Sequence, residues 1–357
     1  MATPPLLTAV ILTHNRPDNL PGQLRLFQRF HHPIIVADSS DPEIAIRVRA
    51  LLPDVVQYQR HSPGSTLYDK LELVLRTIET PFVLTVSDRK IAFPHAADAL
   101  LAHLVSHEDH VSAQGYTVGF GVHEDAVDIN RVVCFTPTIG EGDPLQRLYH
   151  LMRRYQSWAF GVFRTAPLTR AAAQARSVEG AVFQEILLMN AIALQGKLAR
   201  LPIILNLQTE ERSFHLPKKN DPFFWFLDDI GSFVEHYLRY RKALTRFLVE
   251  LGVSVPPNSD LDQLVNMIHA VWLHRNFDYG TLNHATRLLL GDRIRPLSPP
   301  NTTIRWRAPA WWDVVNHGKR RYVWRRAVLR AQPRTEIRIS TAERKRVVEQ
   351  LDAYFGM

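Results

Sequence analysis

The chain has 357 residues, a single cysteine and a formal net charge of +8 at pH 7. This length favours about two domains, and the lone Cys134 excludes an internal disulfide. No apolar run approaches the roughly 20 residues that a membrane-spanning helix needs, and the N-terminus lacks the basic start of a secretory signal. A cytoplasmic protein is therefore expected.

Short apolar runs alternate with helical patterns from Leu7 to about residue 207. This alternation predicts an α/β fold with a Rossmann-like, mostly parallel sheet and helices on both faces. Strands are predicted at residues 7–12, 33–37, 55–59, 82–86, 111–119, 131–135, 159–163 and 202–207. Helices are predicted at 19–30, 42–52, 67–78 and 95–105, where apolar residues recur three and four positions apart.

The pattern changes after Ser213, where strands give way to long helices predicted at 223–251, 261–276 and 281–290. Ser259 and Asp262 have the spacing of a capping box that begins the second of these helices. We therefore predict a sheet domain over residues 1–212 and a helical region with a basic, aromatic tail over 213–357.

The positive charge is concentrated in that tail. Between Arg305 and Arg346, thirteen Lys and Arg stand against three acidic residues, a net of +10, so the rest of the chain carries about −2. Tryptophans and arginines interleave at 304–330, a composition suited to contact with a membrane surface or with nucleic acid. A pair of helices whose tryptophans pack on the domain is the favoured interpretation, and nucleic acid is the least favoured.

The first two predicted strands both end in polar residues: Thr13, Asn15 and Arg16 after the first, Asp38 and Ser39 after the second. Ligands of open α/β sheets bind at the carboxyl ends of the strands, so these loops predict a nucleotide site. Arg16 would lie near phosphate or base, and Asp38 would accept from base or ribose. Ordinary strand-to-helix turns would contain similar residues, with Asp41 as a helix cap.

Two later junctions add glycine and positive charge. Gly64 precedes a predicted helix that contains Lys70, and a glycine loop at a helix N-terminus suits a diphosphate, although the Gly-Lys-Ser/Thr ending of a P-loop is absent. The strand at 82–86 runs directly into Ser87, Asp88, Arg89 and Lys90. The polar residues that follow the strands at 7–12, 33–37 and 82–86 would then meet at one edge of the sheet.

Together these junctions resemble the family 2-like glycosyltransferases of the GT-A fold, and in particular a bacterial glycosyltransferase domain. Thr13 to Pro17 resembles the Thr-x-Asn-Arg-Pro end of that family's first strand. The resemblance continues through 82–90, 114–120, 158–165, 183–186 and 196–202, and it covers roughly residues 7 to 212. It implies a nucleotide-sugar donor, a hydroxyl acceptor such as a glycan or a lipid-linked glycan, and a role in polysaccharide or glycoconjugate synthesis, which would take place at the inner face of a membrane.

The resemblance also implies site residues. The family holds a divalent cation, Mn²⁺ or Mg²⁺, with several aspartates where this chain has Asp88 followed by Arg89 and Lys90. Two cations next to one carboxylate oppose a hard metal ion, so we expect transfer without metal or with weak metal dependence. Asp88 is the one candidate metal ligand, and without a metal it would bind ribose or sugar hydroxyls. Lys70, Arg89 and Lys90 would then neutralise the leaving diphosphate.

Glu185 corresponds to the acid that removes the acceptor proton in inverting members of the family, and an acid favoured at a helix start by the macrodipole is the alternative. Two other classes of function stay open. One is an inactive glycan- or nucleotide-binding protein of the same fold, and the other is a nucleic-acid-binding protein that acts through the tail.

Overall fold

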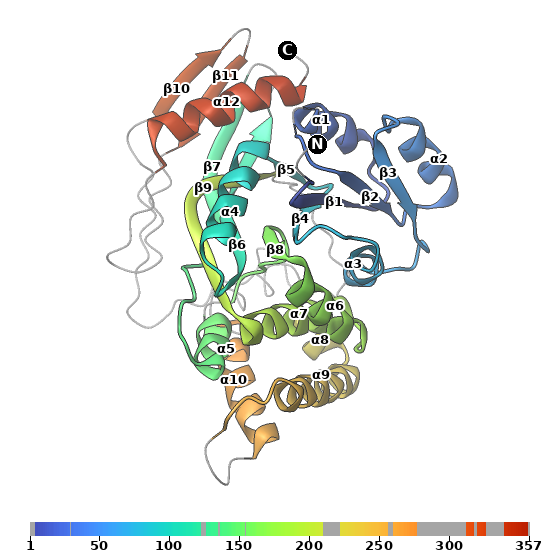
Figure 1. Ribbon diagram of the computed structural model, residues 1–357, viewed down its shortest axis with the longest axis vertical. Helices are drawn as coiled ribbons and strands as arrows, with labels where there is room; N and C mark the ends of the chain where they lie inside the picture. Colours follow the sequence, from blue (N-terminus) through green and yellow to red (C-terminus); the bar gives the residue numbers. More distant parts are fainter. Residues whose placement is uncertain are drawn as a thin grey trace, which may run out of the picture.

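The computed structural model describes residues 4–28, 30–122, 126–134, 136–153, 155–209, 222–255, 260–276, 312–317, 320–325 and 339–355. These residues form one eleven-stranded sheet with helices on both faces, as Figure 1 shows. The main path of the sheet runs β10-β11-β7-β6-β8-β4-β1-β2-β3, and β9 pairs with both β5 and β6. The strands are β1 (Leu7–Thr13), β2 (Ile34–Asp38), β3 (Val56–Arg60), β4 (Phe82–Ser87), β5 (Lys90–Ala92), β6 (His110–Val122), β7 (Ala126–Cys134), β8 (Val162–Arg164), β9 (Lys197–Thr209), β10 (Trp312–His317) and β11 (Arg320–Arg325).

The sheet is mixed, which corrects the prediction of a mostly parallel one. Strands β1 to β4 pair in parallel, and so do β6 with β9 and β7 with β11. The other five pairings are antiparallel. The parallel part carries the three predicted groups of polar residues at the ends of β1, β2 and β4. These groups share one edge because β1 lies between β2 and β4 and all three strands run in the same direction.

Helices cover the two faces of the sheet and define two apolar cores. One core contains residues of α3, α5, α6, α7, α9 and α10, and the other contains residues of α1, α4 and α12. The helices are η1 (Pro17–Asn19), α1 (Leu20–Phe27), α2 (Pro42–Ala50), α3 (Leu67–Leu75), α4 (Pro94–Ser106), α5 (Pro144–Arg153), α6 (Thr165–Arg176), α7 (Ala181–Gln195), α8 (Pro222–Asp228), α9 (Ile230–Glu250), α10 (Leu261–Asn276) and α12 (Thr341–Phe355). The predicted α/β fold with helices on both faces is thus confirmed.

The first four strands follow the prediction within about one residue, because each is short and apolar. All seven residues of β1 are buried, as expected for a strand covered on both faces. Strand β5 and helices α5 and α6 were not predicted. The helix predicted at 223–251 is divided into α8 and α9, since Asp229 interrupts it and caps α9 by accepting from the backbone N–H of Ser232 (2.9 Å).

Helices α8 to α10 follow the sheet region, as predicted, and share one of its cores. Trp225, Phe233 and Trp272 belong to the same apolar cluster as Leu148 of α5 and Phe183 of α7. The cap of α10 is Asp260, whose carboxylate accepts from the N–H of Asp262 (2.9 Å). The predicted cap Ser259, the helix at 281–290 and the boundary at 212/213 lie outside the described residues, so the two-domain division stays a prediction.

The C-terminal region differs from the prediction in two ways. Strands do not stop after residue 213, because β10 and β11 pair with each other and β11 joins β7. A pair of helices was expected over 304–330, and the described part of that segment is the antiparallel pair β10 and β11 instead. The rest of 304–330 lies outside the described residues, so its predicted membrane contact stays a prediction.

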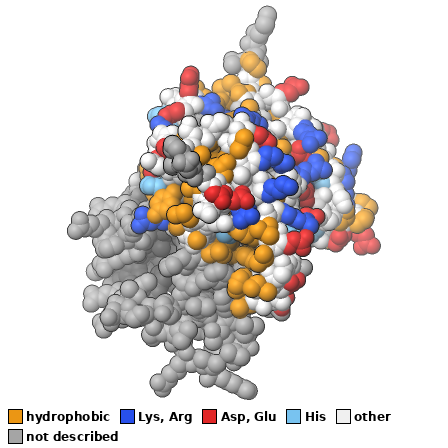
Figure 2. Space-filling view, turned by 90° about the horizontal axis from the view of Figure 1, so that it is seen from below, with side chains coloured by type: hydrophobic (Ala, Val, Ile, Leu, Met, Phe, Trp, Pro, Cys, Tyr) orange, Lys and Arg blue, Asp and Glu red, His pale blue; other side chains and the backbone are white. Residues whose placement is uncertain are grey.

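Helix α12 returns to the N-terminal part of the sheet and packs beside α1 (Figure 1). Within the described stretches, no helix has the length and apolar character to cross a membrane. The face that carries α8 to α10 shows apolar side chains scattered among acidic and basic ones (Figure 2), and exposed Ile230, Val234 and Leu238 lie on α9.

Candidate active site

The carboxyl ends of β1, β2 and β4 form one edge of the sheet. In the register of these strands Thr13 lies beside Asp38, and Leu12 lies beside Ser87. Residues that are 25 to 75 positions apart in the chain therefore meet at this edge, as the sequence predicted. Their contacts show what each side chain does there.

Asp88 binds the end of β1 rather than standing free. Its Oδ2 accepts from the hydroxyl of Thr13 (3.0 Å) and from the backbone N–H of His14 (2.9 Å). Arg16 lies beside it, with Nη1 3.6 Å from Oδ1. The Asp88 side chain is only 4% exposed, so this carboxylate locks the loop after β1 onto the end of β4.

Asn15 ties the same loop to the end of β2. Its side chain and Asp41 exchange hydrogen bonds, one from Asn15 Nδ2 to Asp41 Oδ2 (3.0 Å) and one from the Asp41 N–H to Asn15 Oδ1 (2.8 Å). The backbone N–H of Asn15 donates to the hydroxyl of Ser40 (2.8 Å). Asn15 has φ +56°, a left-handed conformation that asparagine tolerates better than most residues. These hydrogen bonds hold the loop after β1 against the residues that follow β2.

Asp38 and Ser39 are fully buried beneath this loop. The Asp38 carboxylate accepts from the N–H of Ser40 (2.7 Å) and from the hydroxyl of Tyr58 (2.8 Å). Burial, and then that hydrogen bond, raise the pKa of Tyr58 to about 12, so the phenol stays a donor. In this structure Asp38 holds the Ser40 backbone and the Tyr58 hydroxyl in place at the end of β2. Its predicted contact with a nucleoside stays a prediction.

Lys70 is the buried cation of the edge. It is 3% exposed, and its Nζ donates to the carbonyl of Thr13 (2.6 Å). Burial lowers its pKa to about 8, and the nearby Asp88 and Asp38 oppose that shift. Lys70 therefore remains mostly protonated at pH 7 and supplies a fixed positive charge under the loop after β1.

Three further cations, Arg16, Arg89 and Lys90, are partly exposed near the edge. The Arg16 side chain is 37% exposed, Arg89 is half-buried in the turn from β4 to β5, and Lys90 is half-buried at the start of β5. The N–H of Arg89 donates to the hydroxyl of Ser87 (3.2 Å), which orders this turn. Lys90 Nζ lies 4.8 Å from the ring centre of Phe160. Arg16, Arg89 and Lys90 thus add positive charge at the edge, where Asp38 and Asp88 are buried and Asp41 is exposed.

Gly64 lies in the loop before α3, on a surface pocket of about 540 Å³. The pocket is lined by Ser62, Gly64, Ser65, Thr66, Asp69, Leu73, Arg176, Val178, Glu179, Gly180 and Gln184. Thr66 and Asp69 form a capping box that begins α3. A Cβ on Gly64 would meet no atom within 4 Å, so close packing does not require glycine there.

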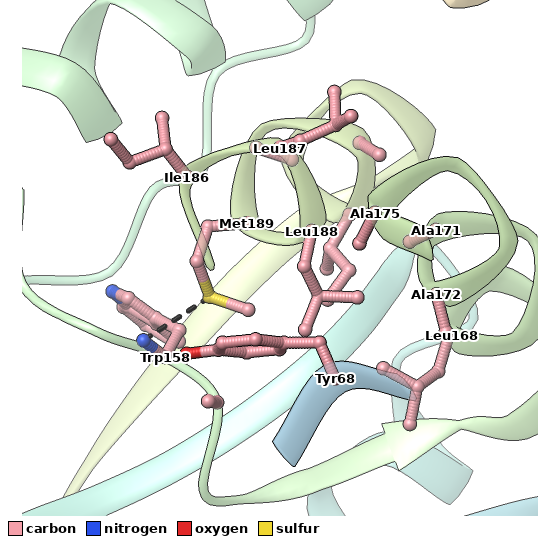
Figure 3. Packing of buried hydrophobic residues seen from close by; sticks show 14 of the residues in the cluster. Tyr68, Trp158, Leu168, Ala171, Ala172, Ala175, Ile186, Leu187, Leu188 and Met189 are labelled. Carbon is pink, nitrogen blue, oxygen red and sulfur yellow. Dashed lines mark hydrogen bonds between the residues drawn. The ribbon is translucent and has the colours of Figure 1, made fainter. Parts of the chain in front are cut away.

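Glu185 lies in the second turn of α7 and is half-buried. Its Oε2 accepts from the hydroxyl of Tyr68 (2.6 Å), and its Oε1 accepts from the hydroxyl of Tyr155 (3.0 Å). The ring of Tyr68 packs against α7 beside Leu188 and Met189, as Figure 3 shows. Tyr68 and Tyr155 were not predicted, because nothing in the sequence pairs them with a glutamate that is 117 and 30 positions away.

Helix α3 connects the two groups of site residues. Tyr68 contacts Glu185, and Lys70, two positions on, contacts the end of β1. Both contacts lie within one turn of the helix. Because successive helix residues are rotated by about 100°, these two side chains leave roughly opposite sides of α3, so Glu185 and the polar edge contact different sides of the same helix.

The edge does not fit a divalent cation. Hard cations need several oxygen ligands, whereas Asp88 is the single carboxylate of the turn, is nearly buried and already binds Thr13, His14 and Arg16. Over the part of the chain that the structure describes, no group of three His, Cys, Asp or Glu residues could hold a metal ion.

No protein-family model matches the chain, and no curated protein matches it. The chain is similar to the crystal structure of S. aureus TarS 1–349, with 15% identity and a TM-score of 0.48 over 78% of this chain and 74% of that one. The complex of TarS 1–349 with UDP-GlcNAc gives 14% identity and a TM-score of 0.42 over 78% and 91%. Glucosyl-3-phosphoglycerate synthase from Mycobacterium tuberculosis, in complex with phosphoglyceric acid, gives 14% and 0.37 over 70% and 81%. Likenesses of this size carry no weight for the activity.

Proposed function

We propose that this protein is a glycosyltransferase that moves a sugar from a nucleotide donor to a hydroxyl acceptor, with inversion at the sugar carbon. The single observation that carries the proposal is the positive edge at the carboxyl ends of β1, β2 and β4. Arg16, Arg89 and Lys90 are partly exposed near this edge, and buried Lys70 donates to the carbonyl of Thr13 at the end of β1. A nucleoside diphosphate is an anion that suits this edge, and the edge is where α/β sheets bind such ligands.

The cations would assist the leaving group. When the bond between the sugar and the diphosphate breaks, negative charge grows on the diphosphate oxygens. Fixed positive groups in a partly buried site stabilise that charge without reorganisation. Arg16 and Arg89 are candidates for direct contact, whereas Lys70 would act through the electrostatic potential because it is covered. Since Asp88 does not fit a metal ion, these cations take the place that a metal would have.

Glu185 would act as the general base. In this reaction the carboxylate takes the proton of the acceptor hydroxyl, the hydroxyl oxygen attacks the sugar carbon, and the nucleoside diphosphate leaves with its bonding electron pair. Each carboxylate oxygen of Glu185 already accepts one hydrogen bond, and each has a second lone pair for the acceptor. We propose a glycan or lipid-linked glycan as the acceptor class.

A thermal-shift screen tests the donor site. The protein is heated with UDP, GDP, UDP-glucose, UDP-N-acetylglucosamine and GDP-mannose, each with manganese and with chelator. Binding raises the melting temperature by mass action, and we expect a shift that chelator does not abolish. Arg16→Gln and Arg89→Gln should weaken it. Arg246→Gln on α9 is the matched control, because its exposed side chain pairs with Glu250 and lies away from the edge.

A turnover assay tests the base. Release of nucleoside diphosphate from the donor that binds should fall about 10² to 10⁴-fold in Glu185→Gln. Donor binding should persist in this variant, since the glutamine keeps the size of the side chain. Unchanged turnover would remove Glu185 from the mechanism, and no shift with any nucleotide would remove the proposed donor.

The second candidate is an inactive nucleotide-binding protein of the same fold. It is favoured by the fact that the carboxylates of Asp88 and Glu185 are both engaged within the protein. This candidate predicts a thermal shift with nucleotides without release of nucleoside diphosphate from any donor. The turnover assay therefore separates the two.

A further inference from the structure

The carboxylate of Glu185 is held between two tyrosine hydroxyls, one on each oxygen. Tyr68 donates to Oε2 (2.6 Å) and Tyr155 donates to Oε1 (3.0 Å). We propose that Tyr68 and Tyr155 are positioning residues, which fix the direction in which Glu185 presents its remaining lone pairs to the acceptor hydroxyl. This inference rests on the proposed function of Glu185 as a base.

The first tyrosine is itself immobilised. Tyr68 is 6% exposed, and its ring lies against α7 with the hydroxyl end towards Trp158 (Figure 3). Helices α3 and α7 are tied again next to it, because Gln184 Nε2 donates to Asp69 Oδ1 (3.1 Å). Two consecutive residues of α3 thus bind two consecutive residues of α7. The Tyr68 hydroxyl has little freedom to follow a moving carboxylate.

The second tyrosine connects the base to the helical region. The ring of Tyr155 lies edge-on to Trp272 of α10, with ring centres 6.4 Å apart and an interplanar angle of 87°. Trp272 is 2% exposed, and α10 packs against α5, the helix that precedes Tyr155 in the chain. Helix α10 therefore supports one of the two groups that hold Glu185.

Both phenols are suited to act as permanent donors. Burial raises the pKa of Tyr68 and of Tyr155 well above the usual 10, and the Glu185 carboxylate raises both further. Neither hydroxyl loses its proton near neutral pH. A donor on each oxygen restrains rotation of the carboxylate, and correct geometry of reacting groups is a large part of catalysis.

The test is a double-mutant cycle on turnover. With the nucleotide-sugar that binds in the thermal-shift screen, Tyr68→Phe should lower kcat about tenfold and leave the KM for the donor unchanged. In the Glu185→Gln background the same change should lower kcat less than about twofold, because there is no base left to position. Tyr155→Phe carries the same expectation, so a folding defect in one variant leaves the other as a test.

The matched control is Tyr240→Phe. Tyr240 is 1% exposed in the same core, and its hydroxyl accepts from Asn190 Nδ2 (2.7 Å) rather than contacting Glu185. This control should leave kcat within about twofold of the wild type. The positioning role would be overturned if Tyr68→Phe lowered kcat equally in the wild type and in Glu185→Gln. It would also be overturned if Tyr240→Phe lowered kcat as much as Tyr68→Phe.

A second readout is independent of turnover. Tyrosinate absorbance at high pH should show Tyr68 and Tyr155 ionising more readily in Glu185→Gln than in the wild type, since the negative partner is gone. If the wild type consumes no donor although the tyrosines ionise more readily in Glu185→Gln, the proposed function is refuted, and the role of the tyrosines is refuted with it. An active wild type with unimpaired Tyr→Phe variants refutes the positioning role alone.

Discussion

His269 of α10 makes the stability of this protein depend on pH. The side chain is 1% exposed, lies among the rings of Phe183, Tyr237, Tyr240 and Trp272, and has no hydrogen-bond partner on either ring nitrogen within the described stretches. Burial lowers its pKa from 6.5 to about 3. His269 is therefore neutral in the folded protein at pH 5, whereas the same residue in the unfolded chain is protonated.

The sign follows from proton linkage. Below pH 6.5 the unfolded state binds a proton that the folded state excludes, so stability falls as the pH falls from 6.5 towards 3. Each pH unit in this window costs about 1.4 kcal/mol. Between pH 7.5 and pH 5.0 the free energy of unfolding should thus drop by about 2 kcal/mol through His269 alone.

The measurement compares urea unfolding at these two pH values in the wild type and in His269→Phe, which keeps an aromatic ring but cannot titrate. The wild type should lose about 2 kcal/mol more than the variant. Tyr237→Phe is the control from the same cluster, and it should retain the full loss because no titrating group near pH 6 is removed. Equal losses in the wild type and His269→Phe would refute the reasoning.

Two further substitutions test the packing around the site. Asp88→Asn should cost about 1.5 to 3 kcal/mol of stability, since a charged acceptor for Thr13 and His14 is replaced by a neutral one, and urea unfolding at pH 7.5 measures it; a change below about 0.5 kcal/mol would contradict the locking role. Gly22→Ala should cost about 1 to 3 kcal/mol, because its Cβ would lie 2.5 Å from the ring of Tyr354. That cost should largely vanish in a Tyr354→Ala background, and a cost that persists there would show that the ring is not the obstacle.

Strands β1 to β4 could be predicted from the sequence because each is a short, almost continuous apolar run that ends in polar residues. The same regularity placed Thr13, Asp38 and Ser87 at one edge. Helix α7 offered no such signal, since it is buried nearly all round and shows no alternation between apolar and polar faces. Strand β11 joins the sheet by pairing with β7, a partner almost 200 residues away, which local sequence does not report.

The roles of the site residues were harder to predict than their positions. Charge and spacing identified Lys70 and Asp38, but not that both are buried, because burial depends on how α3 and Tyr58 pack over the ends of the strands. Tyr68 is the clearest omission. Nothing in the sequence around Tyr68 indicates a functional role for it. Only the packing of α3 against α7 brings its hydroxyl to Glu185.

The position of α12 has a consequence for how this protein is made. Val347, Val348 and Leu351 fill the core beneath α1 and α4, and the Glu343 carboxylate accepts from the Ile204 N–H of β9 (2.8 Å). A ribosome releases these residues only after more than three hundred others have been synthesised. The face of the sheet beneath α1 and α4 therefore stays incompletely covered until α12 has been synthesised, and until then its apolar residues are open to association with other chains.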